Sequence, residues 1–201
     1  MIGFYNYTVI LTYIGLASSV FGMFAAFSRR PELAVICLII SGICDMFDGK
    51  IARTMDRTKD EKRFGIQIDS LCDLISFGIL PVSIGISVTG FKLSYGIVYT
   101  FYVLAAVIRL AYYNVTEENR QDEESGERQY YEGLPVTNIT LIVPVLFLIR
   151  RFVGQFFPIV YEIVIFIVGC AFIISFKVKK HPFRHIIDED LDIEERTYIN
   201  K

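Results

Sequence analysis

Residues 45 to 73 decide the fold class, because they place acidic side chains at the ends of two apolar segments. The first part reads Asp45-Met-Phe-Asp48-Gly49-Lys-Ile-Ala52-Arg53. After eleven intervening residues, the second part reads Gly65-Ile-Gln-Ile-Asp69-Ser-Leu-Cys-Asp73. An apolar run precedes the first part and another follows the second. Placing carboxylates at the ends of membrane-length segments costs free energy, so such residues indicate a functional site.

The spacing puts the polar residues of each part on one face of a helix. In the first part they stand at i, i+3, i+4, i+7 and i+8, and in the second at i, i+4 and i+8. Folded as a helical hairpin, the two faces meet and four carboxylates converge: Asp45, Asp48, Asp69 and Asp73. Oxygen ligands of this kind suit hard divalent cations such as Mg²⁺, Mn²⁺ or Ca²⁺.

The other residues of the two parts fit an anionic ligand at the same place. Gly49, Ala52 and Gly65 are small and leave room for a ligand close to the backbone. Arg53 can neutralise a phosphate that such a metal brings. The alternative without a functional site is that the aspartates are charges at helix ends, either solvated or paired with nearby basic residues.

The composition predicts an all-α integral membrane protein of one domain, residues 1–201. Hydrophobic residues make up 53% of the 201-residue chain, and the mean hydropathy is +0.47. The first apolar run is expected to be retained as a span, since no basic residue precedes it. The four cysteines are expected to be reduced and buried. Six spans are predicted, at about 8–27, 32–53, 65–88, 93–113, 134–149 and 158–176, with a tail at 177–201.

The basic residues predict the orientation of this six-helix bundle. With both termini on one side, that side holds fifteen of the 20 Lys and Arg residues. The other side holds five: Arg29, Arg30, Lys92, Arg150 and Arg151. The positive-inside rule therefore places both termini and a polar active-site cleft at the cytoplasmic face of the cell membrane. The basic residues lie at membrane edges, which favours contacts with anionic lipids over nucleic acid.

The two-part motif, Asp-x2-Asp-Gly-x2-Ala-Arg followed by Gly-x3-Asp-x3-Asp, resembles the signature of the CDP-alcohol phosphotransferase family. All eight signature residues are present, although the intervening stretch is longer than in many members. The resemblance implies that an alcohol attacks a CDP-linked lipid and that CMP leaves. It also implies two divalent cations, Mg²⁺ or Mn²⁺ with Ca²⁺ as a further candidate, and a homodimer.

The resemblance also implies a role for each signature residue. Asp45, Asp48 and Asp69 would be metal ligands, and Asp73 would share in metal binding and act as general base on the attacking hydroxyl. The CDP-lipid site would be lined by Asp45, Gly49, Ala52, Arg53 and Gly65.

Three further features resemble the branch of the family that uses L-serine with CDP-diacylglycerol. Asp73 is followed by Leu74 and then by Phe77-Gly78-x2-Pro81, and the loop expected at residues 54–64 is long and charged. Arg109-Leu-Ala-Tyr-Tyr-Asn114 and Gly133-Leu-Pro-Val136 resemble two more segments of that branch, with Tyr113 in place of the usual Phe. Serine is a zwitterion, so Arg109 could meet its carboxylate, and Asn114 and Glu132 its ammonium group.

Other interpretations stay open at this point. Arg109 could be an interfacial anchor, Asn114 a helix cap and Glu132 a solvated loop residue. The acceptor could be inositol phosphate or glycerol 3-phosphate. Four intramembrane carboxylates could also form the ion site of a cation or proton transporter. The transporter interpretation does not require Gly49, Ala52 and Arg53. A scaffold role is a more distant alternative still.

Overall fold

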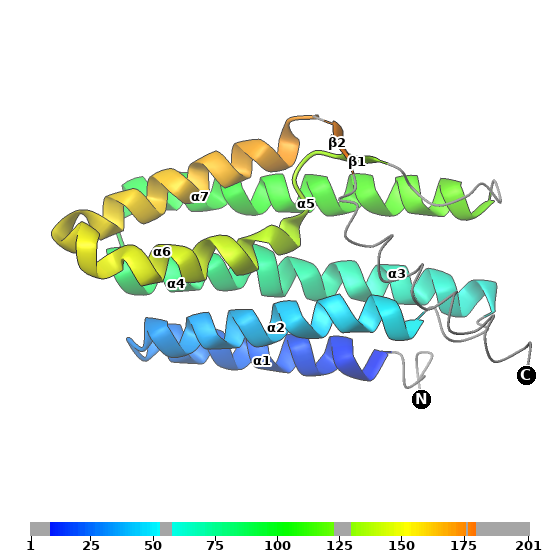
Figure 1. The fold of residues 1–201 in the computed structure, drawn as a ribbon, viewed down its shortest axis with the longest axis horizontal. Helices are drawn as coiled ribbons and strands as arrows, with labels where there is room; N and C mark the ends of the chain where they lie inside the picture. Colours follow the sequence, from blue (N-terminus) through cyan, green and yellow to red (C-terminus); the bar gives the residue numbers. More distant parts are fainter. Residues whose placement is uncertain (1–8, 53–57, 123–129, 176, 180–201) are drawn as a thin grey trace, which may run out of the picture.

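The computed structural model describes residues 9–52, 58–122, 130–175 and 177–179, which form an elongated bundle of helices (Figure 1). The helices are α1 (Ile10–Phe27), α2 (Pro31–Ala52), α3 (Lys59–Asp73), the π-helical η2 (Leu74–Ile79), α4 (Leu80–Thr89), α5 (Leu93–Asp122), the 3₁₀ turn η3 (Val136–Asn138), α6 (Ile139–Val153), the 3₁₀ turn η4 (Gly154–Phe156) and α7 (Phe157–Ile173). Two three-residue strands, β1 (Tyr130–Glu132) and β2 (Lys177–Lys179), pair antiparallel. The predicted all-α class is confirmed apart from this short ribbon.

Four segments of the described chain are long and apolar enough to cross a membrane: Ile10–Phe27, Lys59–Thr89, Leu93–Glu118 and Val136–Ile173. The last segment contains both α6 and α7, which fold back on each other in Figure 1. Helix α2 is not among the four, and it carries Glu32, Asp45, Asp48 and Lys50 within its length. The count of six spans therefore stays a prediction, because length and composition identify four.

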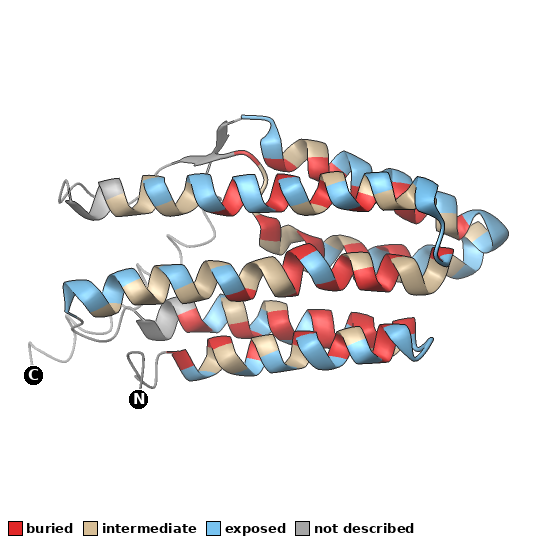
Figure 2. Cartoon of the chain, turned by 180° about the vertical axis from the view of Figure 1, so that it is seen from behind, coloured by how far each residue is buried: buried red, intermediate tan, exposed pale blue. Residues whose placement is uncertain are grey.

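The loop predicted at residues 54–64 is wrong from residue 59 onwards, where α3 begins. Thr58 and Glu61 form a capping box: the Thr58 backbone N–H donates to Glu61 Oε2 over 2.9 Å, and the Glu61 N–H donates to Thr58 Oγ1 over 3.3 Å. This box satisfies two backbone donors that a helix start otherwise leaves open. The first turn of α3 is largely exposed, as Figure 2 shows, so a charged sequence is compatible with a helix here.

Helix α5 is longer than the fourth span, which is predicted at 93–113. The helix continues to Asp122, so Asn114 is not a helix cap. The polar extension contacts the middle of α3, where Gln67 Nε2 donates to Glu118 Oε1 over 3.4 Å. Hydropathy marks where a helix leaves an apolar environment, but it does not mark where the helix itself ends.

Pro81, where the sequence predicts a kink, lies in the first turn of α4, directly after the π-helical segment η2, which begins after Asp73. Because Pro81 has no N–H, the carbonyl of Phe77 loses its normal helical partner. The hydroxyl of Tyr102 on α5 donates to this carbonyl over 2.6 Å. The hydroxyl of Tyr161 on α7 donates to the carbonyl of Pro81 over 2.8 Å, so two buried tyrosines hold the irregular segment in place.

Replacing Tyr102 with Phe is therefore expected to destabilise the fold, because a buried carbonyl would lose its partner. The free energy of unfolding should fall by about 1–3 kcal/mol, measured by denaturant titration in mixed micelles. The matched control is Tyr13→Phe on α1, since no partner for the Tyr13 hydroxyl is found in the described part of the chain. Equal stability of Tyr102→Phe and wild type would contradict this account of the π-helical segment.

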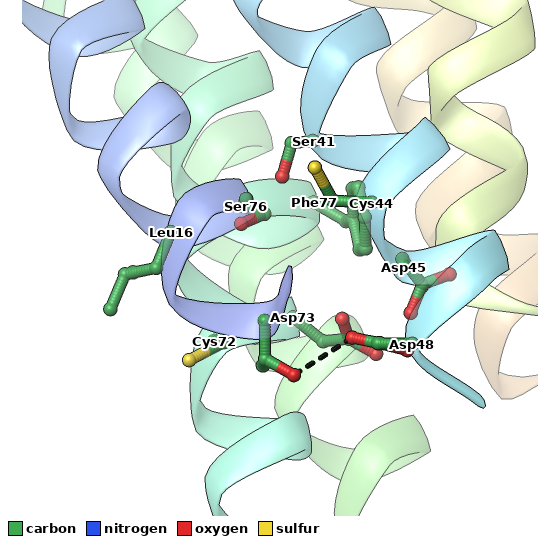
Figure 3. Close-up of a pocket in the computed structure, with 11 residues that line it drawn as sticks. Leu16, Ser41, Cys44, Asp45, Asp48, Cys72, Asp73, Ser76 and Phe77 are labelled. Carbon is green, nitrogen blue, oxygen red and sulfur yellow. Dashed lines mark hydrogen bonds between the residues drawn. The ribbon is translucent and has the colours of Figure 1, made fainter. Parts of the chain in front are cut away.

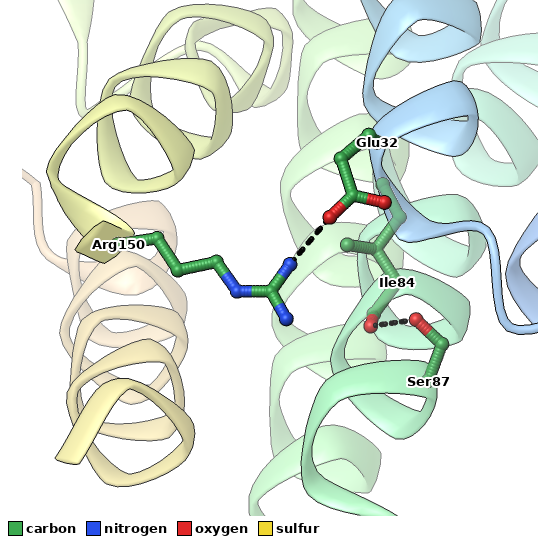
Figure 4. Close-up of polar contacts among 4 residues, drawn as sticks. All are labelled: Glu32, Ile84, Ser87 and Arg150. Atoms are coloured by element: carbon green, nitrogen blue, oxygen red, sulfur yellow. Dashed lines mark hydrogen bonds and ion pairs between the residues drawn. The ribbon is translucent and has the colours of Figure 1, made fainter. Parts of the chain in front are cut away.

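The turns that join α1 to α2, α4 to α5, and α6 to α7 lie at the same end of the bundle (Figure 1). The five basic residues assigned above to the outer side lie on or beside these turns. One of them is paired: Arg150 Nη1 of α6 donates to Glu32 Oε1 of α2 over 2.6 Å (Figure 4). Its guanidinium group also lies 5.5 Å from the centre of the Phe157 ring. This pair connects the start of α2 to the last turn of α6.

Candidate metal centre and substrate site

The acidic cluster is built by the end of α2 and the end of α3. Asp45 and Asp48 stand one turn apart near the end of α2, and Asp69 and Asp73 stand one turn apart on the last turns of α3. Asp48 is buried, while the other three are partly buried. The helical hairpin predicted from the spacing is thus present, and its two acidic faces meet.

Asp45, Asp48 and Asp69 each offer a carboxylate oxygen, and these three oxygens lie within 4.8 Å of one another. Like charges so close together repel each other, and a cation between them removes this repulsion. The donor set consists of carboxylate oxygens, which Mg²⁺, Mn²⁺ and Ca²⁺ prefer. The residues present therefore fit the divalent cation that the sequence predicts.

Asp73 lies outside this group of three but borders the same space. A pocket with an empty volume of about 190 Å³, partly open to solvent, is lined by Asp45, Asp48 and Asp73 and by residues of α1, α2, α3 and η2. Figure 3 shows the three aspartates around one end of the pocket and Ser41 and Ser76 at the other. Asp73 therefore borders the same pocket as two of the three clustered carboxylates.

Helix α1 contributes Thr12 to this pocket, and its Ser19 contacts two serines that line the pocket; the sequence analysis missed both residues. Thr12 Oγ1 donates to Asp48 Oδ2 over 2.9 Å, which is the bond that ends on Asp48 in Figure 3. Ser19 is within hydrogen-bonding distance of Ser41 Oγ, at 2.9 Å, and of Ser76 Oγ, at 2.8 Å. The available signal was a line of small and polar residues on an otherwise apolar helix, namely Thr12, Gly15, Ser19 and Gly22.

Several predicted CDP-lipid residues are only partly described. Gly49 and Ala52 lie in the last turn of α2 beyond Asp48, but their surroundings are not described. Arg53 lies outside the described residues. Gly65 is on α3, one turn before Asp69, and is partly buried. Their roles stay predictions.

Arg109 and Asn114, predicted to bind the acceptor, both lie on α5. Arg109 is buried, and its Nε donates to the carbonyl of Leu134 over 3.2 Å. Asn114 Oδ1 accepts from Ser70 Oγ over 2.6 Å, so it contacts α3 next to Asp69. Glu132 is the last residue of β1, and its side chain is not described.

The Gly133–Pro135 segment is more than a turn into α6. Gly133 has a φ of 78°, which favours glycine, and a Cβ at this position would lie 3.0 Å from the carbonyl of Ile174. The Leu134 N–H donates to the carbonyl of Ala171 on α7 over 3.3 Å. Together with the Arg109 bond, these contacts fix the segment against α5 and the end of α7.

Comparison with known proteins agrees with the signature. A family model described as CDP-alcohol phosphatidyltransferase matches residues 5–175. The CDP-diacylglycerol–serine O-phosphatidyltransferase of Saccharomyces cerevisiae is 33% identical over 162 residues, which is 71% of this chain and 56% of the relative. The enzyme of the same name from Helicobacter pylori (strain 26695) is 32% identical over 133 residues, or 63% and 52% of the two chains.

The archaetidylserine synthase of Methanothermobacter thermautotrophicus is 27% identical over 128 residues, which is 63% of this chain and 51% of the relative. The chain thus spans about half the length of the curated relatives it matches. The family model, in contrast, covers α1 to α7, including both halves of the acidic cluster. The chain therefore belongs to the CDP-alcohol phosphatidyltransferase family.

Proposed function

We propose that this protein is a phosphatidylserine synthase, which transfers a phosphatidyl group from CDP-diacylglycerol to L-serine and releases CMP. The observation that carries the proposal is the convergence of Asp45, Asp48 and Asp69, from the two halves of the signature, beside Asp73. The relatives named for serine as acceptor support the choice of alcohol.

The three clustered carboxylates would hold the divalent cation, with Asp73 as a shared ligand if two ions bind. When bound, Mg²⁺ or Mn²⁺ would compensate the charge of the pyrophosphate, polarise the phosphorus and stabilise the leaving CMP phosphate. The protein itself then needs to do little covalent chemistry, because positioning and charge compensation dominate phosphoryl transfer. Gly49, Ala52, Arg53 and Gly65 would line the CDP part of the donor.

Asp73 would take the proton from the serine hydroxyl. Its place at the edge of the pocket, next to but outside the three-carboxylate group, supports this division of labour. A general base must come within hydrogen-bonding reach of the proton that it removes. A serine hydroxyl that enters the pocket beside Asp45 and Asp48 would come within such reach of Asp73.

The acceptor site would lie between α3 and α5. Arg109 would meet the serine carboxylate, and its bond to the Leu134 carbonyl supports this role because it fixes the direction of the guanidinium group. Asn114 Oδ1 accepts from Ser70 Oγ, and Ser70 follows Asp69 in the chain. Asn114 would accept from the serine ammonium group beside α3. Glu132 would be a second acceptor for the ammonium group.

The membrane arrangement is part of the same proposal. We place α1, α2, α3–η2–α4, α5, α6 and α7 as six spans of one catalytic domain, residues 1–201, with the acidic cluster and both termini at the cytoplasmic face. The lipid donor then reaches the cluster from the bilayer, and serine reaches it from the cytoplasm. From the family resemblance we further propose a homodimer.

The choice of acceptor can be tested by identifying the lipid product. Purified protein in detergent, with CDP-diacylglycerol and Mn²⁺, would receive L-serine, glycerol 3-phosphate and inositol phosphate together at equal concentrations. Mass spectrometry should find phosphatidylserine as the main new lipid, and Arg109→Lys should raise the KM for serine with a smaller change in kcat. A phosphorylated alcohol in the product would keep the chemistry and overturn serine as the acceptor.

A further inference from the structure

We infer that Thr12 of α1 is a positioning residue of the proposed metal centre: its hydroxyl holds the Asp48 carboxylate in the orientation that binds the cation. The inference rests on the proposed metal site but not on the identity of the acceptor. Thr12 stands 33 positions before Asp45, outside the family signature.

The contact itself is short and shielded from water. Thr12 Oγ1 donates to Asp48 Oδ2 over 2.9 Å, and the exposed fractions of the two residues are 9% and 7%. Hydrogen bonds that end on an ionised acceptor are stronger than neutral ones. Asp48 is also one of the three residues whose carboxylate oxygens lie within 4.8 Å of one another. The Thr12 hydroxyl therefore acts on a group inside the cluster.

The position of Thr12 is fixed by the residues that follow it on the same face of α1. A Cβ at Gly15 would lie 3.2 Å from Cys44 Cβ, so α1 and α2 approach closely just before Asp45. One turn further on, the buried Ser19 hydroxyl lies between those of Ser41 on α2 and Ser76 on η2. These contacts hold α1 against α2 and η2, so the bond from Thr12 to Asp48 is a built feature rather than a chance meeting of surface groups.

The expected consequence concerns metal affinity. A carboxylate with one oxygen held by a donor has fewer orientations to lose when it binds a cation. Removing a donor that orients a metal ligand typically weakens metal affinity or activity by about 10–100-fold. Loss of the Thr12 hydroxyl should therefore weaken binding of the cation, whereas the rate at saturating cation should recover most of its wild-type value.

The test measures Mn²⁺ binding directly, by electron paramagnetic resonance of free Mn²⁺ in titrations of the purified full-length protein without substrates. Thr12→Val replaces the hydroxyl by a methyl group of similar size, and Thr12→Ala removes the same hydroxyl with less bulk. Thr12→Ser keeps the hydroxyl. The matched control is Ser18→Ala, which removes another bond from α1 to α2, the one to the carbonyl of Cys37 over 3.1 Å. Size-exclusion profiles and unfolding midpoints show which variants are folded.

We expect Mn²⁺ binding to be about 10–100-fold weaker in folded Thr12→Val and Thr12→Ala. Binding should stay close to wild type in Thr12→Ser and Ser18→Ala. Wild-type affinity in the folded valine and alanine variants would overturn the inference. So would an equal loss of affinity in Ser18→Ala, because packing of α1 would then explain the effect. Asp48→Asn distinguishes failure of this inference from failure of the proposed metal site. Unchanged Mn²⁺ binding in Asp48→Asn would mean that the metal site itself is absent.

Discussion

Asp48→Asn is expected to lower CMP release by at least about 10²–10³-fold, the size of effect seen when one charge-stabilising group is removed from an active site. The reason is the density of charge: Asp45, Asp48 and Asp69 converge within 4.8 Å, and Asn retains the shape of Asp48 but not its charge. Two remaining carboxylates hold a divalent cation less firmly, and the pyrophosphate of the donor then loses its counter-charge. Asp45→Asn and Asp69→Asn should behave in the same way.

The same substitution should not destabilise the metal-free protein. Without a cation the clustered carboxylates repel each other, so removing one negative charge relieves repulsion. The Asn side chain can still accept the hydrogen bond from Thr12. Unfolding midpoints in detergent with a chelator should therefore be equal to or above those of wild type, while CMP release with Mn²⁺ is lost.

Asp60→Asn is the matched control, because Asp60 is an exposed aspartate in the first turn of α3, on the same helix as Asp69. It should retain wild-type CMP release and Mn²⁺ binding. An Asp48→Asn protein that is folded and fully active would contradict the metal site. A loss of activity that is matched by a loss of stability would instead assign Asp48 a structural role.

Asp73→Asn is expected to have the second large effect on activity. It should lower turnover much more than it lowers metal affinity. Asp73 borders the pocket next to Asp45 and Asp48 but is not one of the three clustered residues. As the general base for the serine hydroxyl it should contribute about 10²–10⁴-fold to the rate. We therefore expect a loss of kcat of that size, while Mn²⁺ still binds at the three other carboxylates with a smaller loss of affinity.

The comparison with Asp48→Asn gives this prediction its control. If Asp73→Asn loses Mn²⁺ binding as completely as Asp48→Asn does, Asp73 acts chiefly as a ligand and the base lies elsewhere. If Asp73→Asn retains wild-type turnover, the proposed proton transfer is wrong. Electron paramagnetic resonance for Mn²⁺ and single-turnover CMP release, measured on the same preparations, distinguish these outcomes.

The local features of the site can be predicted from the sequence, because helical spacing alone determines which residues share a face. The spacing therefore predicts that Asp45 with Asp48, and Asp69 with Asp73, lie on the facing sides of two helices. The extent of α2, Pro31–Ala52, is also close to the predicted 32–53. The early start of α3 is a missed local signal, since Thr58 and Glu61 are a recognisable capping box.

The remaining features depend on packing between distant segments, which periodicity does not report. The bond from Thr12 to Asp48 joins residues 36 positions apart, and that from Tyr102 to the Phe77 carbonyl joins residues 25 apart. Pro81 predicts an interruption of the helix, but the hydroxyls that meet the carbonyls of Phe77 and Pro81 come from tyrosines on two other helices. Likewise, the sequence singles out Arg109, but its contact with Leu134 depends on how the segment before α6 packs against α5.

The measurement that tests the central claim most directly is CMP release by the purified wild-type protein in detergent, supplied with CDP-diacylglycerol. The account predicts CMP release that requires both L-serine and Mn²⁺ or Mg²⁺, stops when a chelator is added and resumes when the metal is restored. CMP release that continues unchanged in the chelator would contradict the role of the four aspartates. Absence of CMP release with any alcohol, from folded protein loaded with metal, would contradict the proposed reaction itself.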